Sequence, residues 1–334
     1  MSLNKVNAAG LREMIRLTTE AGKTLFIEGA PGCGKTAIAR AEIKSLGRPL
    51  VYECAAYLTQ ANFGLPCPDG DWLKVLRPNR WFAQENATLI FDEADKLSPM
   101  MQQQMAQIAH ERRLGDDHLP KGCSVILIGN RTADANGSYG VSNILSSRTA
   151  RIEYAPEASE VLLYGHTAGW HPLLLAALEM NKAYVNKPDP AKDRFPCSRS
   201  WENASDILKL TDNRDRWPLI TAAHVGDEAT AHIEALLSCY TELTPVAECL
   251  RNPDKAGIPK NPAAIMLQGT IVASETSMTT ARAALKYLAR FPKEVALSLY
   301  IALQSRLGGN LLVMAREVMP DVIGAVIKMQ QASK

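Results

Sequence analysis

The chain has few aromatic residues, almost no net charge and no long apolar run. Of its 334 residues, 6% are aromatic, and the formal net charge is +2. No stretch approaches the roughly 18 consecutive apolar residues of a membrane helix. The first residues also lack the continuous apolar segment of a secretion signal. These absences predict a protein without a membrane span, located in the cytoplasm.

Patterns for disulfides and metal centres are missing as well. The seven cysteines contain no CxxC pair, which favours reduced thiols, and the six histidines lack metal-site spacing. The small net charge gives no support to a broad nucleic-acid surface, although it leaves a local basic channel open. What remains is an ordinary globular composition with 46% hydrophobic residues, enough for a sizeable core and about two domains.

The first half of the sequence alternates between apolar strands and helices. The expected elements are strands at 24–28, 50–54, 88–91 and 124–128, and helices near 7–21, 35–46 and from Pro99 onward. Strands separated by helices predict a parallel sheet with right-handed crossovers. Strand patterns stop near Tyr154, and the rest of the chain is helix-like. The predicted fold is therefore α/β, a parallel sheet flanked by helices, with an all-helical region behind it.

Residues 29–36 satisfy the phosphate-loop pattern GxxxxGK[ST] between an expected strand and an expected helix. They are Gly29, Ala30, Pro31, Gly32, Cys33, Gly34, Lys35 and Thr36. Glycines allow backbone N–H groups to surround phosphate oxygens, and a helix N-terminus favours negative charge. Lys35 offers a charge to the β- and γ-phosphates, and Thr36 offers a hydroxyl to Mg²⁺. The pattern predicts binding of a nucleoside triphosphate with magnesium.

Two acidic residues follow an apolar strand, at the end where α/β sheets place their ligands. Asp92 is expected to hold Mg²⁺ directly or through water, and Glu93 to polarise the attacking water. This pair indicates hydrolysis rather than binding alone. Asn130 ends the expected strand at 124–128, where its amide can reach the γ-phosphate or the water, although asparagine is also an ordinary turn residue.

The order of these motifs resembles the AAA+ ATPases, and most of all their MoxR-type subgroup. Three further stretches carry the resemblance: Phe63–Pro66 with Pro68–Gly70, Asp92–Lys96 running into Ser98-Pro99, and His110–Gly115 before Pro120 and Gly129-Asn130. The likeness covers about residues 20–205 and fades after about 210. It implies an enzyme that hydrolyses ATP, with ATP and Mg²⁺ as cofactors, in which Thr36 and Asp92 hold the metal.

The resemblance also assigns roles to single residues. Asn130 corresponds to the family's sensor 1, beside the catalytic Glu93. The segment Gly140–Arg148 resembles the helix that ends in the arginine finger, which makes Arg148 the candidate and Arg151 its rival. Arg199 corresponds to sensor 2. There the match is partial, because Cys197 and Ser198 precede this arginine where the subgroup has S-P.

An arginine finger that reaches the neighbouring subunit implies a ring, most often a hexamer. The implied domains are a nucleotide-binding domain at 1–154, a helical lid at 160–250 and a helical C-terminal extension at 260–334. The implied function is to remodel, assemble or activate a protein client, together with a partner that carries a von Willebrand factor A domain.

Two other functions stay open at this stage. One is a nucleotide-gated binding module with little turnover. It is disfavoured because Glu93 and Arg148 are a candidate hydrolytic acid and a candidate arginine finger. The other is a nucleic-acid motor or loader, disfavoured by the small net charge. Its basic pore would use Lys96, Arg112, Arg113 and Lys121. Client contacts are expected in the inserts at 62–80 and 111–121. The aromatic and apolar candidates are Trp72, Leu73, Trp81 and Phe82, with burial of the aromatics as the alternative.

Overall fold

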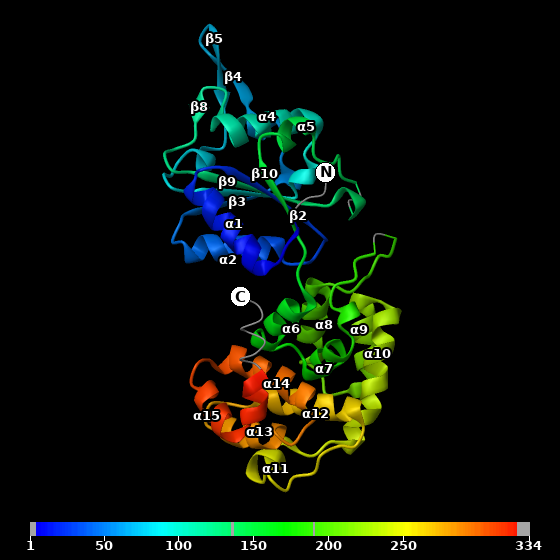
Figure 1. Cartoon of the computed structure of the whole chain (residues 1–334). Helices are drawn as coiled ribbons and strands as arrows, with labels where there is room; N and C mark the ends of the chain where they lie inside the picture. Colours follow the sequence, from blue (N-terminus) through cyan, green and yellow to red (C-terminus); the bar gives the residue numbers. More distant parts are fainter. Residues whose placement is uncertain (1–4, 135–136, 190, 326–334) are drawn as a thin grey trace. The chain divides into compact units, whose positions relative to one another are not determined.

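The chain divides into two compact units in a computed structural model that describes residues 5–134, 137–189 and 191–325 (Figure 1). The first unit comprises Met1–Glu157 and Pro188–Asp193, and the second comprises Ala158–Lys187 and Arg194–Lys334. No helix in the described part of the chain is long and apolar enough to cross a membrane.

The first unit is built on a six-stranded parallel sheet in the order β1-β10-β2-β9-β6-β3. Its strands are β1 (Lys5–Val6), β2 (Thr24–Gly29), β3 (Leu50–Cys54), β6 (Thr88–Asp92), β9 (Ser124–Asn130) and β10 (Ala150–Tyr154). The four strands expected from the sequence are confirmed, and β1 and β10 extend the sheet. Because β9 lies between β2 and β6, the carboxyl ends of all three meet at one edge.

Helices cover both faces of this sheet (Figure 1). They are α1 (Ala8–Glu20), α2 (Lys35–Ser45), α4 (Pro99–Glu111) and α5 (Asn143–Ser146). In β2, Leu25 and Ile27 join the cluster of α1 and α2, whereas Phe26 joins that of α4 and α5. Side chains alternate along a strand, so two apolar faces require apolar residues throughout. The predicted arrangement, a parallel sheet flanked by helices, is therefore confirmed.

Two hairpins leave the sheet between its strands. The first, β4 (Leu65–Asp69) with β5 (Trp72–Leu76), follows the short helix α3 (Gln60–Phe63); the second pairs β7 (Arg113–Leu114) with β8 (Asp117–His118). Trp72 and Leu73 on the first hairpin are 81% and 73% exposed. Trp81 is 1% exposed and packs edge-on against Phe63 and Phe91. For Trp81 the alternative of a buried aromatic is therefore confirmed, and a contact with a client is excluded because the ring fills the core.

The described part of the second unit contains helices and no strand. They are α6 (Ala158–Thr167), α7 (Pro172–Met180), α8 (Ser198–Leu208), α9 (Trp217–Val225), α10 (Asp227–Leu237), α11 (Val246–Arg251), α12 (Pro262–Glu275), α13 (Ala281–Leu288), α14 (Lys293–Leu307) and α15 (Leu311–Val318). The predicted helical region is confirmed. Its apolar residues form two clusters, one within 161–267 and one within 249–323. The predicted split into 160–250 and 260–334 stays a prediction.

Candidate nucleotide site

The phosphate loop turns sharply between β2 and α2 because its glycines adopt conformations that other residues rarely adopt. Gly32 and Gly34 have φ values of 70° and 97°, in the left-handed region. A Cβ on Gly29 would lie 2.5 Å from the carbonyl oxygen of Tyr154 on the neighbouring β10. The sheet therefore requires glycine at the first position of the loop, independently of any ligand.

The Lys35 side chain is buried under this loop. Its Nζ donates to the carbonyl oxygens of Gly29 and Ala30, both at 2.9 Å, and to Oδ1 of Asn130 at 3.2 Å. The lysine is 8% exposed. Its ammonium lies where the carboxyl ends of β2 and β9 meet, since Gly29 pairs with Asn130 in register. Two residues that the sequence singled out separately, Lys35 and Asn130, are thus in direct contact.

Asp92 is the last residue of β6 and contacts Thr36, which follows Lys35 in the phosphate loop. Its Oδ2 accepts hydrogen bonds from Thr36 Oγ1 at 2.7 Å and from the Tyr52 hydroxyl at 3.0 Å. Its Oδ1 accepts from the backbone N–H of Glu93 at 2.9 Å. A hydroxyl and a carboxylate at hydrogen-bond distance form a hard oxygen donor set that fits Mg²⁺. Among the described residues, no group of three or more His, Cys, Asp or Glu side chains forms a metal site.

Tyr52 is a site residue that the sequence reasoning missed. It lies on β3, and burial together with the Asp92 charge raises its pKa to about 12, so its phenol stays a hydrogen-bond donor at neutral pH. The guanidinium of Arg40 lies 4.9 Å from the centre of its ring. Only the pairing of β3 with β6 brings Tyr52 next to Asp92. The strand pattern contained no signal for this contact.

Glu93 has a backbone conformation that is uncommon for a residue with a side chain. Its φ and ψ are 56° and 36°, in the left-handed region, directly after the strand that carries Asp92. The side chain is 43% exposed and lies 3.7 Å from the ammonium of Lys96. Such conformations cluster at functional sites, where surrounding contacts maintain them. The strain falls on the residue that the sequence assigned as the hydrolytic acid.

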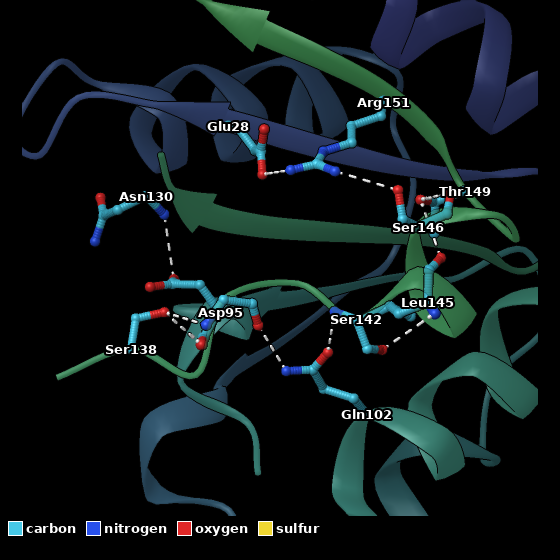
Figure 2. Close-up of polar contacts among 11 residues, drawn as sticks. Glu28, Asp95, Gln102, Asn130, Ser138, Ser142, Leu145, Ser146, Thr149 and Arg151 are labelled. Carbon is cyan, nitrogen blue, oxygen red and sulfur yellow. Dashed lines mark hydrogen bonds and ion pairs between the residues drawn. The ribbon is translucent and has the colours of Figure 1, made fainter. Parts of the chain in front are cut away.

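A buried carboxylate connects the tip of β9 to the next segment of the chain. Asp95 is 1% exposed, and its Oδ1 accepts a hydrogen bond from the backbone N–H of Asn130 at 3.2 Å (Figure 2). Its carbonyl oxygen accepts from Ser138 Oγ at 2.7 Å and from the Tyr139 N–H at 3.2 Å. Asp95 therefore joins Asn130 to the segment that leads into α5.

Gln102 of α4 anchors the same segment further along. It is 1% exposed; its Nε2 donates to the carbonyl oxygens of Leu97 and Gly140, and its Oε1 accepts from the Ser142 N–H (Figure 2). Ser142 in turn caps α5 by accepting from the Leu145 N–H. The start of α5 is thus set by one buried amide side chain, which the sequence pattern did not single out.

The two candidate arginines beyond α5 differ in their surroundings. Arg148 is exposed and donates to the carbonyl oxygen of Ile144 at 2.9 Å. Arg151 on β10 forms an ion pair with Glu28 and donates to Ser146 Oγ (Figure 2). The Glu28 side chain is 3% exposed, and the Arg151 guanidinium also lies over the Phe26 ring. Arg151 is committed to the interior of its own unit, whereas Arg148 faces solvent.

Two further arginines were singled out from the sequence, Arg199 as sensor 2 and Arg112 as a residue of a basic pore. Arg199 is exposed at the second position of α8, in the second unit, and its role as sensor 2 stays a prediction. Arg112 donates to the carbonyl oxygens of Gly22 and Cys123, and burial lowers its pKa. The prediction that Arg112 lines a basic pore was therefore wrong, because its guanidinium is hydrogen-bonded to these two carbonyl oxygens.

Comparisons with known proteins add little to this geometry. No protein-family model matches the sequence, and no curated protein matches it. NtrX from Brucella abortus in complex with ADP is 15% identical over 98% of this chain and 68% of its own, with a TM-score of 0.36. The Thermotoga maritima RuvB Holliday junction branch migration motor is 14% identical over 92% and 87%, with a TM-score of 0.36. Such scores carry no argument about function, which rests on the residues above.

Proposed function

We propose that this chain is a Mg²⁺-dependent ATPase of the AAA+ class. The observation that carries the proposal is the contact set of Lys35, Thr36, Asp92 and Asn130 at the carboxyl edge of three neighbouring strands. Each of these residues offers what a triphosphate with its metal needs, a positive charge, oxygen ligands or an amide. A glycine-rich loop at a helix N-terminus adds backbone N–H groups to the same place.

Each residue has a distinct task in this proposal. Lys35 exchanges its backbone carbonyl partners for phosphate oxygens, because a phosphate-loop lysine supplies positive charge to the β- and γ-phosphates. Thr36 and Asp92 would hold Mg²⁺, which neutralises charge that develops on the phosphates. Tyr52 keeps the Asp92 carboxylate oriented by its hydrogen bond. The chain thereby positions the triphosphate before any bond is broken.

The acid and the amide act on the attacking water. Glu93 polarises this water, and its exposed carboxylate follows directly after the metal-binding Asp92. Asn130 orients the water or the γ-phosphate with the amide that contacts Lys35 in this structure. Because proton transfer needs a nearby base, Glu93→Gln should bind ATP and lose turnover.

Arg148 acts as the arginine finger of a neighbouring subunit in the proposed assembly. Its exposure supports this role over Arg151, whose guanidinium is paired with a buried acid. In other NTPases such an arginine raises kcat by about 10³–10⁵. A hexameric ring follows as part of the proposal, and Arg199 would contact phosphate as sensor 2.

The proposed work of the ring is to remodel, assemble or activate a protein client, with a von Willebrand factor A domain protein as partner. Exposed Trp72 and Leu73 on the β4–β5 hairpin support a protein contact, because large apolar side chains at a hairpin tip favour docking. This assignment and a cytoplasmic location rest on the resemblance and composition of the sequence.

The test is a subunit-mixing experiment on steady-state ATP hydrolysis. Increasing fractions of Arg148→Ala protein are added to wild type at constant total concentration. A shared site in a ring whose subunits hydrolyse ATP in concert predicts that activity falls more steeply than dilution, and Glu93→Gln confirms that the measured turnover belongs to this site. Arg316→Ala, an exposed arginine in the second unit, is the matched control and should leave the activity of the mixture unchanged. Linear loss with Arg148→Ala would contradict a finger that acts within a concerted ring.

A further inference from the structure

The second unit contains a pocket that the proposed ATPase does not use. Its volume is about 230 Å³, and it is bounded by residues of α6, α7, α12 and α14, by the segment between α6 and α7, and by Lys209 at the end of α8. Apolar walls come from Trp170, Leu175, Ala273 and Ala302, all buried. The pocket lies wholly within one unit, so its shape is set by that unit alone.

The polar groups of this pocket are mainly hydrogen-bond donors. Trp170 is 2% exposed, and its buried Nε1–H has no acceptor among the described residues. His171 Nδ1 accepts from the Leu173 N–H at 3.3 Å, which places the hydrogen of the neutral ring on Nε2. Burial and the charge of Lys209 lower the His171 pKa to about 4, so the ring is neutral near pH 7. A buried indole N–H without an acceptor is costly unless a ligand or water accepts it.

Two cations line the same pocket, and within the described ranges no carboxylate does. Arg306 donates through Nη2 to the carbonyl oxygens of Ala273 and Thr276, and burial lowers its pKa. No carboxylate pairs with Arg306 among the described residues. The Lys209 ammonium forms an ion pair with Asp206 at 3.2 Å, and both side chains are exposed.

The acid that faces the lining residue His166 already has partners. Glu179 lies 3.5 Å from His166 Nε2 and 3.9 Å from the Lys182 ammonium. The charge at the pocket is therefore positive, from Arg306 and a partly compensated Lys209, beside an unpaired indole N–H. Arg306 is half-buried and Lys209 is exposed; a cation that is partly removed from water is stabilised when an anion is brought to it.

We propose that this pocket binds a small organic anion. Its oxyanion head accepts hydrogen bonds from Lys209, Arg306 and the Trp170 Nε1–H, and its apolar body packs against Leu175 and Ala302. The volume exceeds what a bare inorganic ion fills, and the apolar walls favour a ligand with a hydrocarbon part. A phosphate or a carboxylate head satisfies this chemistry, and the experiment separates the two.

The experiment titrates phenyl phosphate and benzoate, with benzyl alcohol as the neutral comparison, by isothermal calorimetry on the full chain. The chain carries Lys35→Ala, so that the phosphate loop does not contribute to the signal. From typical binding energy per atom, the better anion should bind with a Kd on the order of 1 mM. The anion that binds tighter identifies the head group.

Lys209→Gln should weaken this binding about tenfold, and Trp170→Phe, which removes only the N–H and part of the ring, about three- to tenfold. Lys286→Gln is the matched control, because Lys286 is another surface lysine beside an aspartate, Asp254 at 3.9 Å, away from the pocket. It should leave the Kd unchanged. The proposal is overturned if neither anion binds, if benzyl alcohol binds as well, or if Lys209→Gln and Lys286→Gln behave alike.

Discussion

Replacing Gln102 by alanine should destabilise the segment that leads to Arg148 and leave the parallel sheet intact. The amide of Gln102 makes three hydrogen bonds, at 2.9 Å to Leu97 and at 2.7 Å to each of Gly140 and Ser142. Alanine removes the partner of the buried Leu97 carbonyl before α4 and, within the segment that leads to Arg148, of the Gly140 carbonyl and the Ser142 N–H. The two groups in that segment are only partly buried, so water compensates for them in part.

The size of the effect follows from these two groups. A buried polar group that loses its partner costs about 1–3 kcal/mol, so two partly buried groups should cost about 2–4 kcal/mol locally. If the segment opens on its own, that energy corresponds to roughly 30- to 900-fold faster amide hydrogen exchange. The faster exchange should be confined to residues 138–148, since Asp95 still anchors Ser138 and Tyr139.

The assay is hydrogen–deuterium exchange with peptide-level mass spectrometry on wild type and Gln102→Ala. Gln103→Ala is the matched control, because Gln103 is an exposed glutamine on the same helix. Peptides from the second unit provide an internal reference for global stability. Exchange in 138–148 that matches the Gln103→Ala protein would refute the anchoring role of Gln102.

The same variant connects this segment to the proposed ATPase. If Gln102 acts by positioning Arg148, Gln102→Ala should slow hydrolysis and leave ATP affinity close to wild type. Adding Gln102→Ala to Arg148→Ala should then cause little further loss. A double variant in which the two losses multiply would mean that Gln102 acts elsewhere.

Three other predictions use the remaining contacts. Lys35→Ala should weaken ATP binding more than about tenfold in calorimetry, because the loop loses its charge; wild-type affinity would remove the nucleotide assignment. Arg151→Ala should destabilise the first unit by about 3–5 kcal/mol in urea denaturation, since it leaves Glu28 buried without its partner, whereas Arg148→Ala should change stability by less than about 0.5 kcal/mol. The folded-state pKa of His171, about 4 against an ordinary 6.5, is depressed, so its stabilisation is present above pH 6.5 and lost as the pH falls toward 4. Thermal unfolding of the second unit should therefore depend less on pH over this range in His171→Asn, and an unchanged slope would contradict this.

The sequence by itself determined the elements whose signals are local. The phosphate loop is recognised because glycine, lysine and threonine must stand at fixed spacing between a strand and a helix, and Lys35 and Thr36 lie where that spacing puts them. Asp92 followed from the apolar strand that ends in it. Buried strands and capped helices, such as α4 with Ser98 as its N-cap, likewise have signals within a few residues.

Contacts between distant segments were decided only by the tertiary structure. Tyr52 reaches Asp92 because β3 pairs with β6, and Gln102 reaches Ser142 because α4 packs beside α5. The choice between Arg148 and Arg151 also depended on the fold, since β10 places Arg151 against Glu28 on β2. A sequence specifies such partners only through the packing of the whole unit. Residue type and spacing could therefore name Arg148 and Arg151 as candidate arginine fingers, but only their burial in the structure distinguishes the two.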